Sequence, residues 1–221
     1  MTDIAGHPVP DQAAAADPAA PADVEPDGRR LRRAMNREAV VDALLDLYRE
    51  GSLRPGTDEI AERAGISPRS LFRYFEDTDD LVGEAITRQL ARTLPIVQVD
   101  ADVAAPFQDR VRALVDQRFR LFDAAGQAAY ATRLRAPFQP RLAEILAESR
   151  RFLRGQLRSL FAGELADMGV GRAEWALAAA DVLATFESYQ LLTTDQGFSA
   201  AEAKLVIVES LAALLSPGGP R

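Results

Sequence analysis

The sequence predicts an all-α protein, with a three-helix N-terminal helix-turn-helix unit followed by a C-terminal helical bundle. From Arg29 onward, apolar residues recur at helical spacing. No stretch of useful length alternates apolar and polar residues as a strand does. Cap residues and glycine stops divide the first third of the chain into short helices and the rest into longer ones. A chain of 221 residues can bury a core of its own.

Residues 1–28 are predicted to form a disordered acidic arm rich in Ala and Pro. Thirteen of these 28 residues are Ala or Pro, six are acidic and none is Lys or Arg. Such a segment cannot bury enough apolar surface to offset the entropy lost on ordering. Two interpretations remain open, an inert solvating tail and an acidic arm that competes with DNA for the basic segment beside it.

The remaining chain is predicted to form two domains, a helix-turn-helix domain over residues 29–76 and a bundle for ligand binding and dimerisation over residues 77–216. The first domain is expected to begin with a helix from about Leu31 to Glu50. Thr57, Ser67 and Thr78 are predicted N-caps of the next three helices. Longer helices are expected at about 106–124, 127–135, 138–163, 172–194 and 199–215.

The stretch from Thr57 to Phe75 predicts a helix-turn-helix. Two short helices that cross steeply need a small residue at their contact, and Ala61 supplies it. The turn needs a positive φ, which Gly65 adopts at little steric cost. Ser67 and Pro68 then begin the second helix, as a cap and a first-turn proline do.

The charge distribution favours nucleic acid contact at this unit alone. The whole chain carries a net charge of −7, with a net −6 in residues 1–28 and −4 in residues 76–221. Residues 29–75 carry ten Arg and seven acidic residues, a net +3. The positive excess is therefore confined to the segment that contains the helix-turn-helix.

The exposed side of the second helix is predicted to contact DNA. Arg69 and Arg73 are four residues apart and share a face, where an arginine can hold a guanine edge or a phosphate. The cluster at residues 29–33 is predicted to reach a minor groove or phosphates, with a solvated cluster as the alternative. The predicted DNA-contact residues are Arg29, Arg30, Arg32, Arg33, Arg37, Thr57, Ser67, Pro68, Arg69, Ser70, Arg73, Tyr74 and Thr78.

The same region resembles the DNA-binding domain of the TetR family of transcriptional regulators. The resemblance rests on Arg37, Gly51, IAERAGIS at residues 60–67, LFRYF at residues 71–75, and Leu81. It implies a homodimer that binds a palindromic operator and that a small molecule in the bundle releases. The sequence departs from the family at Gly56, where a phosphate-contacting Thr is common, and at Thr78, where a Lys is common.

Candidate ligand contacts are polar or aromatic residues on apolar helix faces. Arg118 falls near the centre of an apolar stripe, so we expect it to pair with an acid, line a wet pocket or meet a ligand. Ser149 and Gln156 are expected either in a pocket or as satisfied core residues. The aromatic candidates have core packing as their alternative role. The predicted ligand-binding residues are Arg118, Phe119, Phe122, Ser149, Phe152, Gln156, Trp175, Phe186 and Tyr189.

The last two helices predict a homodimer. Apolar residues surround the final helix on nearly every side, and a helix of this kind must be buried on all sides. A second copy is the natural cover at the end of a small bundle. Two recognition helices about 34–36 Å apart would then reach successive major grooves.

The sequence therefore predicts a DNA-binding regulator, with a repressor released by a small molecule as the first hypothesis. The alternatives are an activator, a regulator without a small ligand and, last, an enzyme on a helical bundle. The chain has no Cys and a single His, so catalytic residues, a metal and a cofactor are all predicted to be absent. No apolar run approaches the length of a membrane span, and the chain is expected to be cytoplasmic.

Overall fold

The computed structural model describes residues 25–216 of the chain, and every regular element in that range is helical. This confirms the predicted fold class. The predicted arm lies outside the described residues, apart from its last four. The helices are α1 (Glu25–Arg49), α2 (Thr57–Arg63), α3 (Pro68–Leu71), α4 (Thr78–Thr93), α5 (Phe107–Arg135), α6 (Pro140–Leu160), α7 (Ala162–Asp167), α8 (Val170–Leu183), α9 (Phe186–Gln190) and α10 (Ala200–Leu215).

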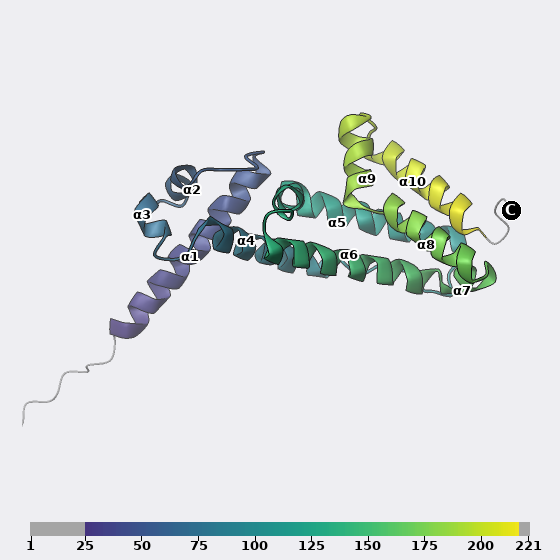
Figure 1. Cartoon of the computed structure of the whole chain (residues 1–221), viewed down its shortest axis with the longest axis horizontal. Coiled ribbons are helices and arrows are strands. Elements are labelled where there is room, and N and C mark those ends of the chain that lie inside the picture. Colours follow the sequence, from purple (N-terminus) through teal and green to yellow (C-terminus); the bar gives the residue numbers. More distant parts are fainter. Residues whose placement is uncertain (1–24, 217–221) are drawn as a thin grey trace, which may run out of the picture.

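The elongated molecule has α1, α2 and α3 at one end and the bundle of α5 to α10 at the other, with α4 between them (Figure 1). The N-terminal half of α1 projects beyond the short helices (Figure 1). A 3-10 turn at Leu94–Ile96 ends α4, and a π-helical turn at Leu191–Asp195 follows α9. This arrangement places the helix-turn-helix as far as possible from α7 and the end of α10.

Several predicted helix boundaries are wrong. Helix α1 begins at Glu25, six residues before its predicted start. The two helices predicted around Gly126 form one helix, α5, with a kink at that glycine, where φ is 50° and ψ is −142°. The helix predicted for 138–163 begins at Pro140 and ends at Leu160, and the one predicted for 172–194 breaks after Leu183. Where these helices end depends on how they pack against neighbouring helices. The local sequence does not encode that packing, so it does not predict the boundaries.

One of the three predicted N-caps is confirmed. The Ser67 side chain accepts a hydrogen bond from the backbone N–H of Ser70 at 3.3 Å. Thr57 and Thr78 are instead the first residues inside their helices, preceded by Gly56 and Asp77. Asp77 caps α4 by accepting from the N–H of Asp80 at 2.8 Å. A carboxylate at this position also interacts favourably with the helix dipole, which a threonine hydroxyl does less well.

Two large apolar clusters, with a third small one of Leu121, Phe122 and Phe186, form the core of the described residues. The first joins the N-terminal helices to α4 and also takes in residues of α5 and α6, such as Ala128, Ala131 and Leu142. The second lies among α5, α6, α8 and α10. Helix α4 packs against both α1 and α5, so it connects the helix-turn-helix to the bundle. The division at residues 76 and 77 stays a prediction.

Candidate functional site

The short helices α2 and α3 have the geometry of a helix-turn-helix. Ile60, Ala61 and Leu71 are fully buried, so both helices turn their apolar sides to the core. Gly65 lies in the turn at φ 68°, which confirms the predicted positive φ. The N–H of Ile66 donates to the carbonyl of Ala61 at 3.0 Å and closes the turn. The turn thereby fixes which residues of α3 face outward.

The outward side of α3 carries exposed cationic residues. Arg69 and Arg73 are exposed, as is Pro68, while Ser70 and Tyr74 are half-buried. Within the described part of the chain, neither of the two guanidinium groups donates to another residue. Phe72, which the sequence did not single out, is 53% exposed on the same short segment. This surface combines positive charge with an aromatic ring, both suited to a nucleic acid.

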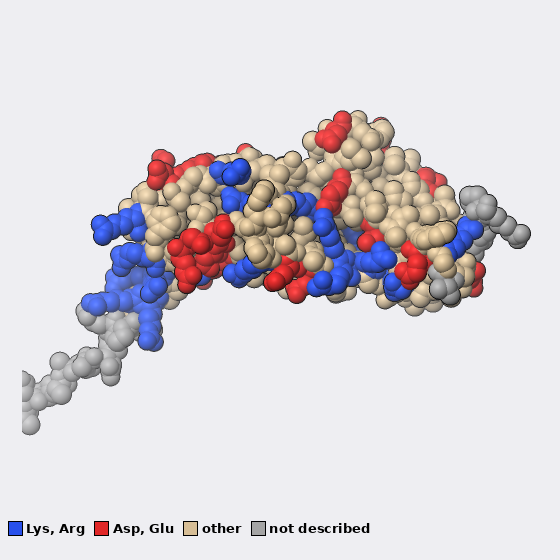
Figure 2. All heavy atoms as spheres, viewed as in Figure 1, with Lys and Arg blue, Asp and Glu red and all other residues tan. Residues whose placement is uncertain are grey.

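The N-terminal half of α1 extends this basic surface. Arg29, Arg30, Arg32 and Arg33 are all exposed, and Lys and Arg side chains gather around this end of the molecule (Figure 2). Arg33 donates to the backbone carbonyl of Arg73 at 3.2 Å, so the arginine-rich helix lies directly against the residues that follow α3. The two predicted groups of DNA-contact residues therefore form one continuous surface.

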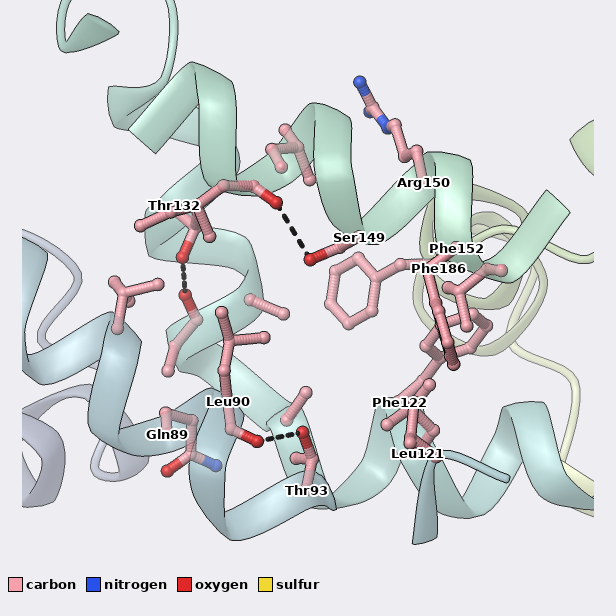
Figure 3. A pocket seen from close by; sticks show the side chains of 18 of the residues that line it. Gln89, Leu90, Thr93, Leu121, Phe122, Thr132, Ser149, Arg150, Phe152 and Phe186 are labelled. Atoms are coloured by element: carbon pink, nitrogen blue, oxygen red, sulfur yellow. Dashed lines mark hydrogen bonds between the residues drawn. The ribbon is translucent and has the colours of Figure 1, made fainter. Parts of the chain in front are cut away.

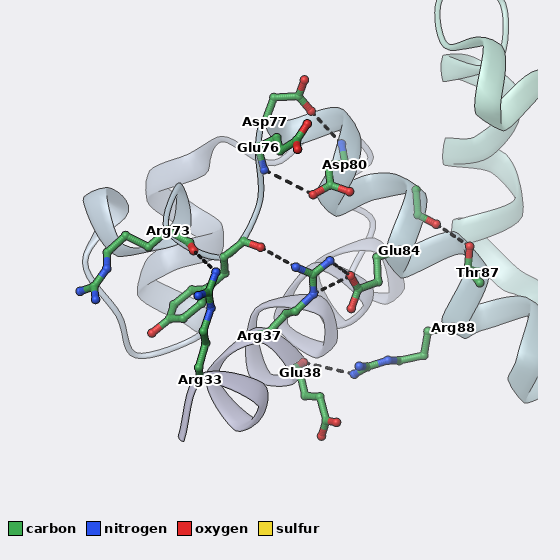
Figure 4. Close-up of polar contacts among 12 residues, drawn as sticks. Arg33, Arg37, Glu38, Arg73, Glu76, Asp77, Asp80, Glu84, Thr87 and Arg88 are labelled. Carbon is green, nitrogen blue, oxygen red and sulfur yellow. Dashed lines mark hydrogen bonds and ion pairs between the residues drawn. The ribbon is translucent and has the colours of Figure 1, made fainter. Parts of the chain in front are cut away.

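Arg37, one of the predicted DNA contacts, makes several contacts within the protein. Its guanidinium donates to the carboxylate of Glu84 in α4, with Nε 2.8 Å from the oxygen, and to the carbonyl of Tyr74 at 2.6 Å (Figure 4). It also lies over the ring of Phe75, 4.6 Å from the centroid. Its hydrogen bond to Glu84 raises the pKa of Arg37. The arginine thus joins α1, the end of the helix-turn-helix and α4.

A second set of contacts joins α1 to α4 further along. Asp42 forms ion pairs with Arg88 at 3.3 Å and with Arg92 at 2.6 Å. Arg88 also donates to the carbonyl of Glu38 at 3.2 Å (Figure 4). Motion of α4 along its axis would break these contacts, so α1 and the helix-turn-helix must move with α4.

A cavity of about 450 Å³ lies between α4, α5 and α6, within the size range of small-molecule sites (Figure 3). Four predicted ligand contacts line it: Phe122, Ser149, Phe152 and Phe186. The exposed side chains of Leu90, Leu94 and Phe152 give it an apolar opening between α4 and α6.

The other five predicted ligand contacts lie outside this cavity. Buried Arg118 donates to the side chains of Gln117 and Gln156 and to the carbonyl of Leu153, so amides and a carbonyl hold it where an acid or a ligand was expected. Burial lowers the pKa of Arg118 to about 10, although the charge of Asp181 opposes the shift. Gln156 is thus a satisfied core residue.

The three predicted aromatic contacts outside this cavity lie in two different environments. Phe119 and Tyr189 pack edge to face, 5.2 Å between ring centroids, and so are core residues. Trp175 is 78% exposed on α8 and does not line the cavity between α4, α5 and α6. A helical pattern identifies the apolar faces of one helix, but it does not say which face meets a cavity.

Several cavity residues were missed by the sequence analysis, among them Gln89, Thr93, Thr132 and Arg133. Arg133 pairs with Glu187 at 3.0 Å and lies 4.3 Å from the centroid of Phe186. Burial lowers the pKa of Arg133, against the opposing effect of Glu187. Thr132 lies on the apolar face of α5, where a threonine is ordinary, so the sequence pattern did not identify it as a cavity residue.

The Gly126 kink joins the cavity to α4. The side-chain amide of Gln89 in α4 donates at 2.7 Å to the carbonyl of Ala124, two residues before the kink. Gln89, Ala125, Ala128 and Ala129 all line the cavity. The cavity therefore borders the contact between Gln89 of α4 and the kinked segment of α5.

Helices α8 and α10 leave apolar side chains on the surface. The most exposed are Trp175 at 78%, Val182 at 65% and Leu205 at 60%. Ala203, Ile207, Leu211 and Leu215 fill the other side of α10 and are buried in the protomer. The protomer's own bundle therefore covers one side of α10 and leaves apolar side chains of the other side exposed.

The described residues were also searched for metal ligands and for membrane-spanning helices. No group of three or more potential metal ligands lies together in residues 25–216. No helix in that range is both long and apolar enough to cross a membrane.

Comparison with known proteins agrees with the helix-turn-helix geometry. Residues 41–85 match the family described as bacterial regulatory proteins, tetR family, which confirms the resemblance. The fold is similar to a tetR-family transcriptional regulator from Streptomyces coelicolor, with a TM-score of 0.63, 22% identity and coverage of 80% of this chain and 81% of that one. It is also similar to a transcriptional regulator from Rhodococcus, with a TM-score of 0.61, 21% identity and coverage of 83% and 99%. No curated protein matches the sequence.

Proposed function

We propose that this chain, whose residues 41–85 match the tetR family of bacterial regulatory proteins, is a transcriptional repressor that binds a palindromic operator as a homodimer. A small molecule in the cavity of the bundle releases it from DNA. The observation that carries the DNA-binding part is the continuous cationic surface of α3 and the N-terminal half of α1, which the turn at Gly65 directs outward.

The proposed DNA contacts divide into two groups. Arg69 and Arg73 on or next to α3, together with Pro68, Ser70 and Phe72, are proposed to enter a major groove. The arginines of the N-terminal half of α1 are proposed to hold phosphates or an adjacent minor groove. Thr57, Ser67, Tyr74 and Thr78 are proposed phosphate contacts, although the Tyr74 hydroxyl already accepts from Asn36 at 2.9 Å.

The proposed dimer uses the exposed faces of α8 and α10. Trp175, Val182 and Leu205 would be buried there, and burial of large apolar side chains is the main driving force of stable association. A two-fold axis through this surface keeps the N-terminal units at the far ends of the two bundles, free to reach two half-sites.

The proposed release is a population shift through α4. The cavity is lined by Ile86, Gln89 and Leu90 of α4, and α4 is held to α1 by the ion pairs of Arg37 and Asp42. A molecule that binds one position of α4 better than another changes the spacing of the two DNA-binding units. Operator binding and effector binding then oppose each other.

The test is selection of bound fragments from sheared genomic DNA, followed by a salt titration of the best site. We expect a palindrome whose affinity falls steeply with salt. Arg69→Ala combined with Arg73→Ala should weaken binding at least about tenfold and, because the dimer carries each change twice, lower the salt slope by about 4 if both contact phosphates. The matched control is Arg120→Ala with Arg151→Ala, which removes two exposed arginines of the bundle and should leave affinity within about twofold. Equal losses in both variants, or no selected site, would refute the proposal.

A further inference from the structure

Two side-chain amides hold the chain where it leaves α4. The turn at Leu94–Ile96 follows α4 directly. Nε2 of Gln117 in α5 donates to the carbonyls of Ile96 and Val97, at 2.9 Å each. Nε2 of Gln156 in α6 donates to the carbonyl of Val97 at 2.8 Å. The last carbonyls of a helical segment have no partner within it, so these amides supply the missing hydrogen bonds.

Arg118 determines which way both amides face. Its Nη1 donates to Oε1 of Gln117 and, at 3.0 Å, to Oε1 of Gln156. A guanidinium has donors and no acceptor, so each amide must turn its oxygen toward Arg118 and its NH2 group toward the chain after α4. Nη2 of Arg118 donates to the carbonyl of Leu153 at 2.9 Å, which holds the guanidinium against α6. These three side chains, Gln117, Arg118 and Gln156, are called the amide clamp below.

The amide clamp is buried and charge-assisted. Arg118 is 2% exposed and Gln117 is fully buried, so water does not compete for their hydrogen bonds. Arg110, the other buried arginine of α5, pairs with Glu164. Among the described residues, Arg118 donates instead to neutral oxygens alone. Hydrogen bonds from a charged donor are stronger than neutral ones, and a buried donor left without its acceptor is costly, so the clamp resists opening.

The amide clamp borders the cavity between α4, α5 and α6. Leu94, Val97 and Gln98, which follow α4, line this cavity together with Leu153 of α6. Val97 and Leu153 are also residues whose carbonyls the clamp holds. A molecule that displaces these side chains therefore acts on the hydrogen bonds that fix the end of α4.

We propose that Arg118, Gln117 and Gln156 are positioning residues for operator binding, which hold the end of α4 so that the two DNA-binding units keep the spacing of the operator. The ion pairs of Arg88 and Arg92 with α1 carry the position of α4 to the DNA-binding unit. Without the clamp, α4 takes more positions and a smaller fraction of dimers has the competent spacing. The apparent dissociation constant rises in inverse proportion to that fraction. The inference rests on the proposed function, but the hold on α4 is measurable without DNA.

The test is backbone hydrogen exchange of the full chain, read by mass spectrometry as the rate for residues 90–98 relative to the rate for α10. A loss of global stability accelerates exchange in α10 as well, so only a local opening raises this ratio. Arg118→Met keeps the apolar stem of the side chain and removes the guanidinium. We expect it to raise the ratio about tenfold, because both amides lose the donor that orients them.

The matched control is Arg110→Met, the same substitution at the other buried arginine of α5. Arg110 donates to Glu164 of α7 and to the carbonyl of Leu160, and it makes no contact with the amide clamp. We expect the ratio to stay within about twofold, since distant sites act independently. An unchanged ratio in Arg118→Met, or an equal rise in both variants, would overturn the inference.

Gln156→Glu is the second variant, in case Arg118→Met fails to fold. Glutamate keeps an acceptor for Arg118 but has no N–H for the carbonyl of Val97. We expect the ratio to rise at least about threefold, because the donor to the end of α4 is lost. If Arg118 were only a structural residue, the added counter-charge would tighten its surroundings. An unchanged or lower ratio would therefore refute the positioning role.

Affinity for the selected operator is the second readout. Arg118→Met should weaken binding at least about threefold with an unchanged salt slope, because no phosphate contact is lost. Arg110→Met should keep affinity within about twofold. A raised exchange ratio with unchanged affinity would overturn the role in operator binding and leave the proposed function standing. Failure of the wild type to bind any operator would overturn the proposed function, while a raised ratio would still establish the hold on α4.

Discussion

Arg37→Met tests whether Arg37 joins helices or contacts DNA. Methionine keeps the apolar stem of the side chain and removes the guanidinium. The half-exposed ion pair to Glu84 accounts for about 1 kcal/mol, since its side chains are 39% and 27% exposed. The hydrogen bond to the Tyr74 carbonyl contributes about 1 kcal/mol, and the contact with the Phe75 ring about 0.5 kcal/mol. We therefore expect the free energy of unfolding to fall by about 2.5 kcal/mol.

The assay is urea unfolding followed by circular dichroism at one fixed protein concentration, because a dimer's stability depends on concentration. Glu84→Gln retains a polar partner for Arg37 and should cost about 1 kcal/mol or less. A double-mutant cycle of the two changes isolates their coupling. If Arg37→Met left stability within about 0.5 kcal/mol and instead lowered the salt slope of operator binding by about 2, one contact in each protomer, Arg37 would be a phosphate contact and the structural role would be refuted.

Three further changes probe the rest of the molecule. Val182→Arg should leave the protomer folded but shift dimer to monomer in analytical ultracentrifugation, and an unchanged dimer would place the interface elsewhere. Gly126→Ala should lower the unfolding free energy by about 1–2 kcal/mol in urea, because φ is +50° there; an unchanged midpoint would mean that the kink straightens without cost. The hydrogen bond from Arg110 lowers the pKa of Glu164 below 4.5 in the folded protein, so the ionised carboxylate stabilises the fold above that pH and stops doing so as the pH falls through the lower folded pKa. The difference in unfolding free energy between wild type and Glu164→Gln should therefore shrink between about pH 6 and about pH 3. A difference that stays constant over this range would contradict the proposed role of Glu164.

The helix-turn-helix could be predicted from sequence because its determinants are local. Ser67, Pro68 and Gly65 act on their own turn or on residues three to five positions away, so their spacing carries the geometry. The apolar periodicity likewise identified the buried faces of α1 and α4. Arg118 was placed correctly on a buried face for the same reason.

The partners of those buried groups could not be predicted. Arg118 meets Gln156 and the carbonyl of Leu153 from α6, and Arg37 meets Glu84 from α4. Periodicity gives the direction in which a side chain leaves its own helix. It does not give the rotation or the axial position of the helix packed against it, and a shift of one residue replaces the partner.

The sequence by itself determined that this protein is all helical, that a helix-turn-helix lies near its N-terminus and that the positive charge gathers there. Only the tertiary structure decided that α4 forms a wall of the cavity, that Thr132 and Ser149 both line it and that Trp175 lies on the surface. Helix formation and turns depend on residues a few positions apart, whereas a cavity is the space left between helices whose packing depends on the whole chain.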